Sequence, residues 1–164
     1  AHTAGLSLYV PLHSTGLHSW DTYKARSTAT TGVAYFDMVM AKGINVEQAK
    51  PRIEEIKRLR PYWLGDYYPL LPVNVNEEAW CAMQFDRPDL GSGIVYLFRR
   101  SQSPYPSVDL RLRGIDPQAT YVVGYEGEDG TREMTGEQLA RLRATIESCP
   151  GSSILRYEKA KPGQ

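Results

Sequence analysis

The sequence predicts an α+β fold in which a C-terminal antiparallel β-sandwich with Greek-key-like connections follows a mixed segment of strands and helices. Two observations support this prediction. After residue 79, apolar side chains recur at every second position in short runs, and turns such as PDLGSG separate those runs. Before residue 75, the apolar residues form continuous runs or recur every three to four positions. We therefore expect two parts, residues 1–74 and residues 75–164.

The strands of the predicted sandwich follow from the alternation of their side chains. In WCAMQFD one face carries Cys81, Met83 and Phe85, and the other carries Trp80, Ala82 and Gln84. The same alternation predicts strands at residues 93–100, 110–113, 121–125, 142–146 and 153–159. Asp129-Gly130 is a strong hairpin signal. TGEQLARL begins with Thr135 and Gln138 in the spacing of a capping box, which predicts a short helix.

The first part of the chain is expected to alternate between strand and helix. LSLYVPL (6–12) is largely apolar and predicts a short strand, and DTYKARSTA can begin a helix at Asp21, whose side chain can cap it. The apolar run VAYFDMVM (33–40) is too short to assign to strand or helix. Strand, helix, strand and helix in this order predict βα units with parallel pairing.

Residues 45–63 give the clearest helix signal. Asn45 and Gln48 resemble a capping box, and Pro61 and Gly65 are expected to end the helix. Pro51 would kink the helix if it lay inside, or would suit the first helical position, and both alternatives stay open here. The expected apolar face comprises Val46, Ala49, Ile53, Ile56, Leu59 and Trp63.

The charges of the chain argue against two classes of partner. Its 164 residues include 19 basic and 19 acidic side chains. This balance does not favour general attachment to nucleic acid or to an anionic membrane. No apolar run approaches the roughly 20 residues that span a bilayer, and the first residues lack the basic region of a signal peptide. We therefore expect no nucleic-acid partner and no membrane partner, and the sequence assigns no compartment.

The cysteines and histidines do not form a metal-binding pattern. Cys81 and Cys149 could bridge the first and last strands in an oxidising compartment, but two buried thiols are the simpler expectation. His13 and His18 are five residues apart, which fits no standard zinc pattern. The sequence therefore predicts neither a metal nor a cofactor.

The stretch RPYWLGDYYPLLP (60–72) carries four aromatic rings. Such a density indicates either a packing joint between two bodies or a stacking surface for a sugar. A sugar has an apolar C–H face and a rim of hydroxyl groups, so its site needs rings beside polar side chains. Residues 20–26 offer the same chemistry in a second segment. The candidate carbohydrate-binding residues are Trp20, Asp21, Tyr23, Arg26, Tyr62, Trp63, Asp66, Tyr67 and Tyr68.

Four segments carry a family resemblance when they are read in order. They are IKRLRPYWLGDYYPLLP, EEAWCAMQFDRPDLGSGIVYLFRR, LRLRGIDPQATYVVGYE and MTGEQLARL. Together they resemble the C-terminal region of a melibiase-type α-galactosidase, of glycoside hydrolase family thirty-six or a near relative. The residues before them, 5–40, resemble the last strand-helix repeats of the catalytic barrel of that family.

The resemblance implies that the chain corresponds to the end of a larger enzyme. Enzymes of that family have an N-terminal β-domain, a (β/α)₈ barrel and a C-terminal β-sandwich, and two aspartates cleave α-galactosides with retention. The catalytic aspartates lie upstream of the matching region, and Asp21, Asp37 and Asp66 are not at those positions. We therefore expect no catalytic residue here. The expected function is a non-catalytic part that supports the barrel and contacts galactoside-type carbohydrate.

Two other functions remain open at this point. A stand-alone carbohydrate-binding module would stack sugars on exposed Trp and Tyr rings, whereas buried rings would favour the packing joint. A small complete glycoside hydrolase would need two carboxylates about 5–10 Å apart. Without the rest of a barrel, residues 1–74 would expose apolar surface. We expect this segment either to repack around the sandwich or to form a homo-oligomer.

Overall fold

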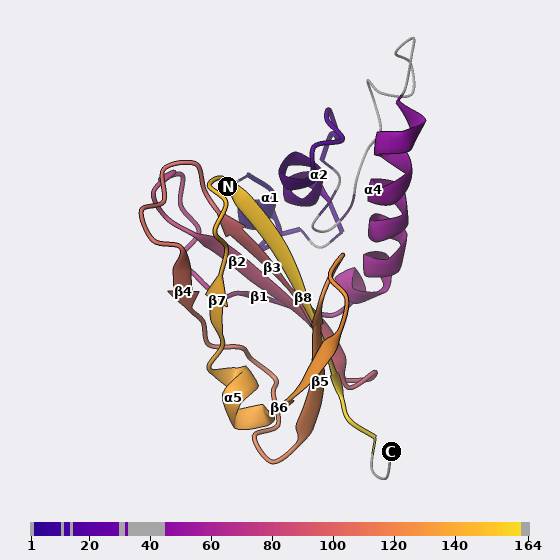
Figure 1. Cartoon of the computed structure of the whole chain (residues 1–164), viewed down its shortest axis with the longest axis vertical. Coiled ribbons are helices and arrows are strands. Elements are labelled where there is room, and N and C mark those ends of the chain that lie inside the picture. The colour runs from indigo at the N-terminus through magenta and orange to yellow at the C-terminus, as the bar shows by residue number, and fades with distance from the viewer. Residues whose placement is uncertain (1, 11, 14, 30–31, 33–44, 162–164) are drawn as a thin grey trace.

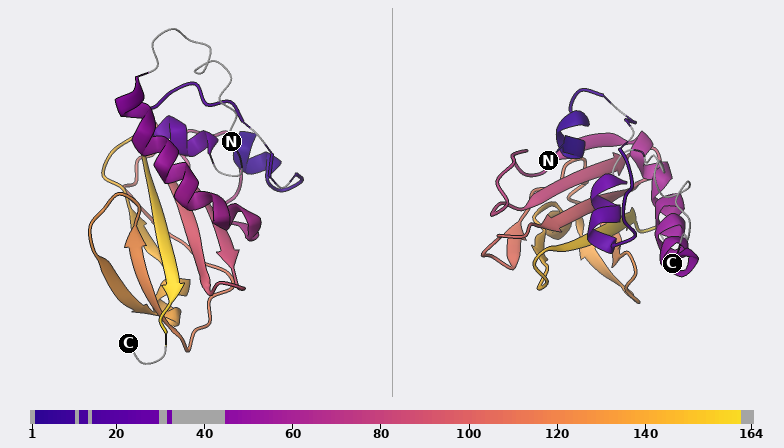
Figure 2. Two further views of the ribbon diagram at one scale, coloured as in Figure 1. Left: turned by 90° about the vertical axis from the view of Figure 1, so that its right-hand side faces the viewer. Right: turned by 90° about the horizontal axis from the view of Figure 1, so that it is seen from above.

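The computed structural model describes residues 2–10, 12–13, 15–29, 32 and 45–161. Its centre is a six-stranded sheet in the order β1-β2-β3-β8-β5-β6, and a second sheet pairs β4 with β7. Figure 1 shows α2 and α4 on one side of the large sheet and β4, β7 and α5 on the other. The two views of Figure 2 show the same layers from the side and from above. This arrangement confirms the predicted α+β class with a β-sandwich.

The bounds of the elements are as follows. The large sheet contains β1 (Asp66–Pro69), β2 (Cys81–Arg87), β3 (Ser92–Arg99), β5 (Thr120–Tyr125), β6 (Thr131–Thr135) and β8 (Gly151–Lys159). The small sheet contains β4 (Ser107–Asp109) and β7 (Arg143–Thr145). The helices are α1 (His2–Leu6), α2 (Thr22–Thr28), α4 (Val46–Leu59) and α5 (Gly136–Ala140), and η1 (Arg60–Leu64) is a 3₁₀ helix.

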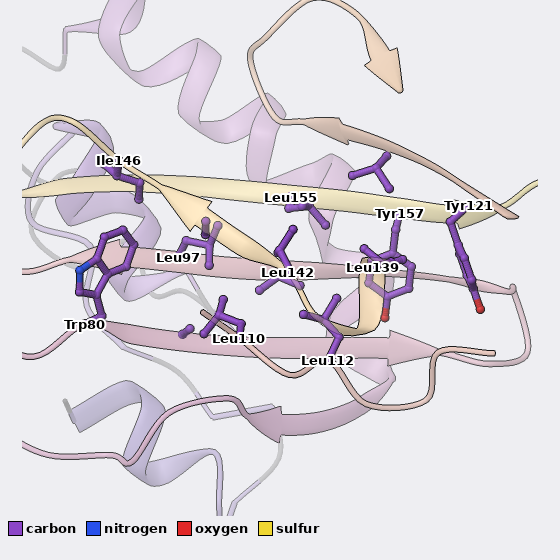
Figure 3. Close-up of a cluster of buried hydrophobic side chains, with 14 residues drawn as sticks. Trp80, Leu97, Leu110, Leu112, Tyr121, Leu139, Leu142, Ile146, Leu155 and Tyr157 are labelled. Carbon is purple, nitrogen blue, oxygen red and sulfur yellow. The ribbon is translucent and has the colours of Figure 1, made fainter. Parts of the chain in front are cut away.

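The large sheet is apolar on both faces, and each face has its own core. The sandwich core lies between the large sheet and the small sheet with α5, and Figure 3 shows Leu97 and Leu155 close to Leu110 and Leu142 there. It comprises Trp80, Ala82, Val95, Leu97, Leu110, Leu112, Tyr121, Val123, Leu139, Leu142, Ala144, Ile146, Leu155 and Tyr157. The helix-side core comprises Ala4, Ala29, Ile56, Leu59, Trp63, Met83, Phe85, Ile94, Tyr96, Phe98 and Ile154.

The alternation in the sequence assigned the side chains of β2 and β3 to the correct faces. Met83 and Phe85 face the helix-side core, and Trp80 and Ala82 belong to the sandwich core. The strand predicted at 110–113 begins earlier, as β4, but its pairing continues into the predicted range. Leu110 N–H donates to the Leu142 carbonyl at 2.8 Å. The short helix predicted after Thr135 is α5, and its capping box with Gln138 is present.

The prediction of a strand at residues 6–12 is wrong. Helix α1 ends at Leu6, and the chain continues in turns, with Ser7 N–H donating to the Thr3 carbonyl at 3.1 Å and Val10 N–H donating to the Leu6 carbonyl at 2.8 Å. These local bonds pair the backbone without a neighbouring strand. A short apolar run does not distinguish the two structures. All strand pairs within the described residues are antiparallel, so the expected parallel βα pairing is absent from them. The run 33–40 lies outside the described residues.

Helix α4 forms where the sequence predicts it. The Asn45 side chain accepts a hydrogen bond from Gln48 N–H, as a capping residue does. Pro51 lies inside the helix, so the alternative in which it is the first helical residue is wrong. Val46 was expected on the buried face but is 67% exposed, because the first turn of α4 extends beyond the sheet. The buried residues of the helix are Ala49, Glu55, Ile56 and Leu59.

Both cysteines are free thiols. Cys81 is half-buried, and Cys149 is exposed, with its Sγ donating to the Arg100 carbonyl at 3.1 Å. The expectation that both thiols are buried is therefore wrong for Cys149, because the loop before β8 lies at the surface. Of the helices in the described part of the chain, none combines the length and the apolar character that crossing a membrane requires.

Candidate functional site

The aromatic stretch that follows α4 packs the helices onto the sheet. Trp63 in η1 is 8% exposed and lies in the helix-side core. Its Nε1–H donates to Tyr96 Oη at 3.1 Å, and Tyr96 O–H donates to the Ala29 carbonyl at 3.0 Å. Burial raises the pKa of Tyr96 above its ordinary value. Trp63 thus connects η1 with β3 and with the end of α2 rather than presenting a ring to solvent.

Tyr67 extends the same joint to the N-terminal helix. Its O–H donates to the Ala4 carbonyl at 3.0 Å, and its ring lies tilted against Phe85 with the ring centres 5.3 Å apart. Burial, with a smaller contribution from Cys81, raises the pKa of Tyr67 to about 12. Tyr62 is half-buried and packs against the helix-side core. The dense rings are therefore mainly a packing joint.

The candidates in residues 20–26 divide between surface and core. The Asp21 side chain is exposed and accepts a hydrogen bond from Lys24 N–H at 3.0 Å, which caps α2 as predicted. Trp20 is half-buried. The ring of Tyr23 meets that of Phe98 edge to face, with centres 5.6 Å apart, and burial raises the pKa of Tyr23. Only part of this segment is therefore accessible to a ligand.

Arg26 is the most constrained of the candidate residues. It is buried, and its Nε and Nη2 donate to the two carboxylate oxygens of Glu55 at 2.9 and 2.8 Å. Its Nη1 donates to the Ser152 carbonyl at 3.0 Å, and Nη2 also donates to the Glu126 carbonyl at 3.3 Å. One guanidinium thus joins α2, α4, β8 and the end of β5, and four hydrogen bonds from its five N–H donors go to protein partners.

The ion pairs continue beyond Arg26 into a network. The buried carboxylate of Glu126 is paired with Arg58 of α4, and its Oε2 lies 3.2 Å from Arg156 Nε of β8. Arg52 pairs with Glu55 at 3.2 Å. We call Arg26, Arg52, Glu55, Arg58, Glu126 and Arg156 the ion-pair network. Sequence reasoning missed its acidic members, although Glu55 stands four residues before Leu59 and so on the buried side of α4.

Asp66 and Tyr68 lie at the far edge of the sheet, in β1. Asp66 is exposed and opposite the buried Asp86 of β2 in the strand register. Tyr157 O–H donates to Asp86 Oδ1 at 2.6 Å and accepts a hydrogen bond from Gln84 Nε2 at 2.7 Å. Burial raises the pKa of Asp86, and Asp66 adds to the rise, while the Tyr157 bond opposes it. Burial also raises the pKa of Tyr68, as do the two aspartates.

The nine candidate residues therefore do not converge on one binding surface. Tyr23, Arg26, Tyr62, Trp63 and Tyr67 contribute to the helix-side packing, whereas Asp21 and Asp66 are exposed at separate places. Carbohydrate binding by these residues stays a prediction. Among the residues that the structure describes, no three side chains of His, Cys, Asp or Glu are grouped as a metal site would require.

A polar depression of about 550 Å³ lies elsewhere, at the end of the sheet where β8 begins. Its residues come from α2, from the β5–β6 hairpin, and from β7 through the start of β8. They are Arg26, Tyr125, Glu126, Glu128, Arg132, Arg143, Thr145, Ile146, Glu147, Ser148, Ser152 and Ser153. No sequence motif marked this depression, because its residues are far apart in the chain.

The Arg26–Glu55 pair gives a prediction about stability. Glu55→Ala leaves the buried Arg26 guanidinium without its carboxylate partner, and Arg26→Ala leaves Glu55 with the less buried Arg52 alone, so each is expected to lower the unfolding free energy, by up to about 3–5 kcal/mol. Lys57→Ala is the matched control, because Lys57 and Glu54 form a largely exposed pair on the same helix; it should change stability by about 0–1 kcal/mol. Urea unfolding followed by circular dichroism measures both. Equal effects of Arg26→Ala and Lys57→Ala would contradict the structural role of the network.

Asp86 gives a prediction about pH. The folded pKa of Asp86 lies above the value of 3.8 that is ordinary for an aspartate, so just above pH 3.8 the folded state binds more protons than the unfolded state. The contribution of Asp86 to stability therefore falls as the pH rises through this interval. Asp86→Asn cannot ionise but can still accept the Tyr157 hydrogen bond, so its unfolding free energy should fall less between about pH 4 and 7. Asp109→Asn, at an exposed carboxylate, is the control. Parallel pH profiles for Asp86→Asn and the unsubstituted chain would refute the prediction.

The fold of this chain is similar to part of several enzymes of known structure. No protein-family model matches the sequence, and no curated protein matches it. The galactosidase domain of the α-galactosidase-sucrose kinase AgaSK superposes on 95% of this chain, with a TM-score of 0.70 and 17% sequence identity. The GH36 α-galactosidase AgaB from Geobacillus stearothermophilus superposes on 96%, with a TM-score of 0.67 and 19% identity. An α-galactosidase from Lactobacillus brevis covers 86%, with a TM-score of 0.62 and 11% identity.

These matches extend over nearly the whole of this chain but over a small part of the enzymes. The chain spans 23% of the AgaSK domain and of AgaB, and 20% of the Lactobacillus brevis enzyme. Sequence identities in this range establish the fold. The chain therefore has the fold of a segment, about a fifth of the total length, of the GH36 α-galactosidases that its sequence resembles.

Proposed function

We propose that this chain is the non-catalytic C-terminal part of an α-galactosidase-like glycoside hydrolase, in which it supports the catalytic barrel. The observation that carries this proposal is the fold match, which covers 95–96% of this chain but only 23% of two solved galactosidases. In our proposal a segment of this share is one part of the framework of such an enzyme. The sequence adds that neither catalytic aspartate of the resembled family has a counterpart here.

The buried rings support the structural role over the stand-alone sugar-binding module. Trp63 and Tyr67 use their polar atoms within the protein, on Tyr96 and Ala4. Arg26 likewise makes four hydrogen bonds to protein groups of the helices and the sheet. These groups hold the helical segment rigidly to the sandwich, as a support at the end of a barrel requires.

Exposed apolar side chains indicate where the chain would contact the barrel in our proposal. Five apolar residues between positions 6 and 12 are 44–84% exposed. We call this surface the N-terminal apolar strip; it comprises Leu6, Leu8, Tyr9, Val10 and Leu12. A group of exposed apolar side chains this close together in the chain marks an interface. In our proposal the strip contacts the preceding repeats of the barrel.

The proposal predicts which part of the polypeptide is required for hydrolysis. The 164-residue chain alone should not release 4-nitrophenol from 4-nitrophenyl α-galactoside, because the catalytic pair is expected upstream. The same chain, expressed together with the reading frame that precedes it, should hydrolyse this substrate. Hydrolysis by the chain alone would instead favour a small complete enzyme. A preceding frame that encodes no barrel would overturn the proposal.

The N-terminal apolar strip also predicts the behaviour of the chain without a barrel. The uncovered strip is expected to drive self-association, which light scattering coupled to gel filtration detects as a concentration-dependent mass. Replacing Leu8, Tyr9 and Leu12 together by Ser should shift the chain toward the monomer. The control replaces Leu64 and Val75, which are exposed to a similar degree outside the strip, by Ser. An equal effect of both sets would show that the strip is not a distinct interface.

A further inference from the structure

The large sheet is narrower where its central strand β8 begins. Strand β3 pairs with β8 from Gly151 to Glu158, whereas β5 pairs with it only from Leu155 to Lys159. Beyond Tyr125 the chain turns away into the β5–β6 hairpin, with Glu126 N–H donating to the Ile154 carbonyl at 2.8 Å. The start of β8 therefore has a strand on one side only. The polar depression opens at this place.

The volume of the depression suits a small ligand. At about 550 Å³ it is within the range of roughly 300–1,000 Å³ that is typical of ligand sites. Part of its boundary is fixed by the ion-pair network. Arg26 is held by Glu55 and by the carbonyls of Ser152 and Glu126, and Glu126 is held by Arg58 and Arg156. A pre-organised boundary of this kind lowers the entropic cost of binding.

The side chains that line the depression carry equal numbers of positive and negative formal charges and several hydroxyl groups. The three arginines, Arg26, Arg132 and Arg143, face three glutamates, Glu126, Glu128 and Glu147, so the formal charges cancel. Tyr125, which also packs against the sandwich core, lines the depression too, as do the hydroxyl groups of Thr145, Ser148, Ser152 and Ser153. Glu128, Arg132 and Glu147 form no ion pair with any residue that the structure describes, so their side chains can bind a ligand.

This chemistry selects one ligand class. An anion would meet three carboxylates, and a cation would meet three guanidinium groups, so neither is favoured by the lining. A purely apolar ligand would bury these charged groups without partners, which is costly. A neutral molecule with many hydroxyl groups can donate to carboxylates and accept from guanidinium groups and from the serine and threonine hydroxyl groups. We propose that the depression binds a neutral saccharide.

Nuclear magnetic resonance of the 164-residue chain tests the proposal. Amide resonances would be followed while galactose, glucose or raffinose is added, with glucuronate and inorganic phosphate as charged comparisons. Saturable shifts from a neutral sugar at Tyr125, Ser148 and Ser153 are the expected result. No saturable shift, shifts centred instead on residues 20–26 or 62–68, or shifts with the charged compounds alone would each overturn it.

A pair of double variants locates the binding. Arg132→Ala with Glu147→Ala should weaken binding about tenfold or more, because each lost charged hydrogen bond contributes measurably to affinity. Arg111→Ala with Glu133→Ala is the matched control, since both residues are exposed and neither lines the depression. An equal loss in both double variants would overturn the proposed location. The test needs no barrel, so its failure would leave the proposed supporting function untouched.

Discussion

The large sheet must be covered on both faces, and the rest of the structure follows from this constraint. Side chains alternate along β2 and β3 so that Ile94 and Tyr96 face the helices while Val95 and Leu97 face the small sheet. A sheet that is apolar on both sides is unstable in water unless two other layers bury it. The small sheet with α5 supplies one layer, and α1, α2, α4 and η1 supply the other. The N-terminal helices are therefore part of the folded unit.

Apolar packing is non-directional, so it does not by itself fix how the layers are positioned against one another. Hydrogen bonds and ion pairs between buried polar groups fix these positions. On the helix side, Arg26 reaches from α2 to Glu55 and to backbone carbonyls of the sheet. On the sandwich side, the buried Gln84 exchanges two hydrogen bonds of 2.8 Å with the backbone of Arg113. Buried polar groups with all partners satisfied favour one arrangement of the layers over others. Arg26 also fixes one side of the polar depression.

Local sequence patterns predicted most of the strands and the helix caps. Contacts between residues far apart in the sequence were not predicted. Alternation identified both faces of β2, and the caps at Asp21, Asn45 and Thr135 were visible in the sequence because each involves residues three positions apart. The segment 6–12 was misassigned, because apolar composition does not determine backbone conformation over so few residues. The Arg26–Glu55 pair, separated by 29 positions, and the depression depend on the tertiary arrangement. No local signal specifies such contacts.

The order of the strands has a consequence for synthesis of the chain. Strand β8 is the last in the sequence but lies between β3 and β5, so it joins the meander β1-β2-β3 to the hairpin β5-β6. These two pieces can begin to form as they leave the ribosome, yet each exposes an unpaired strand edge until residues 151–159 emerge. Unpaired edges of nascent sheets are the surfaces at which chains aggregate. Completion of the large sheet therefore waits until residues 151–159 have been synthesised, and a chain that stops before β8 leaves two half-sheets with unpaired edges.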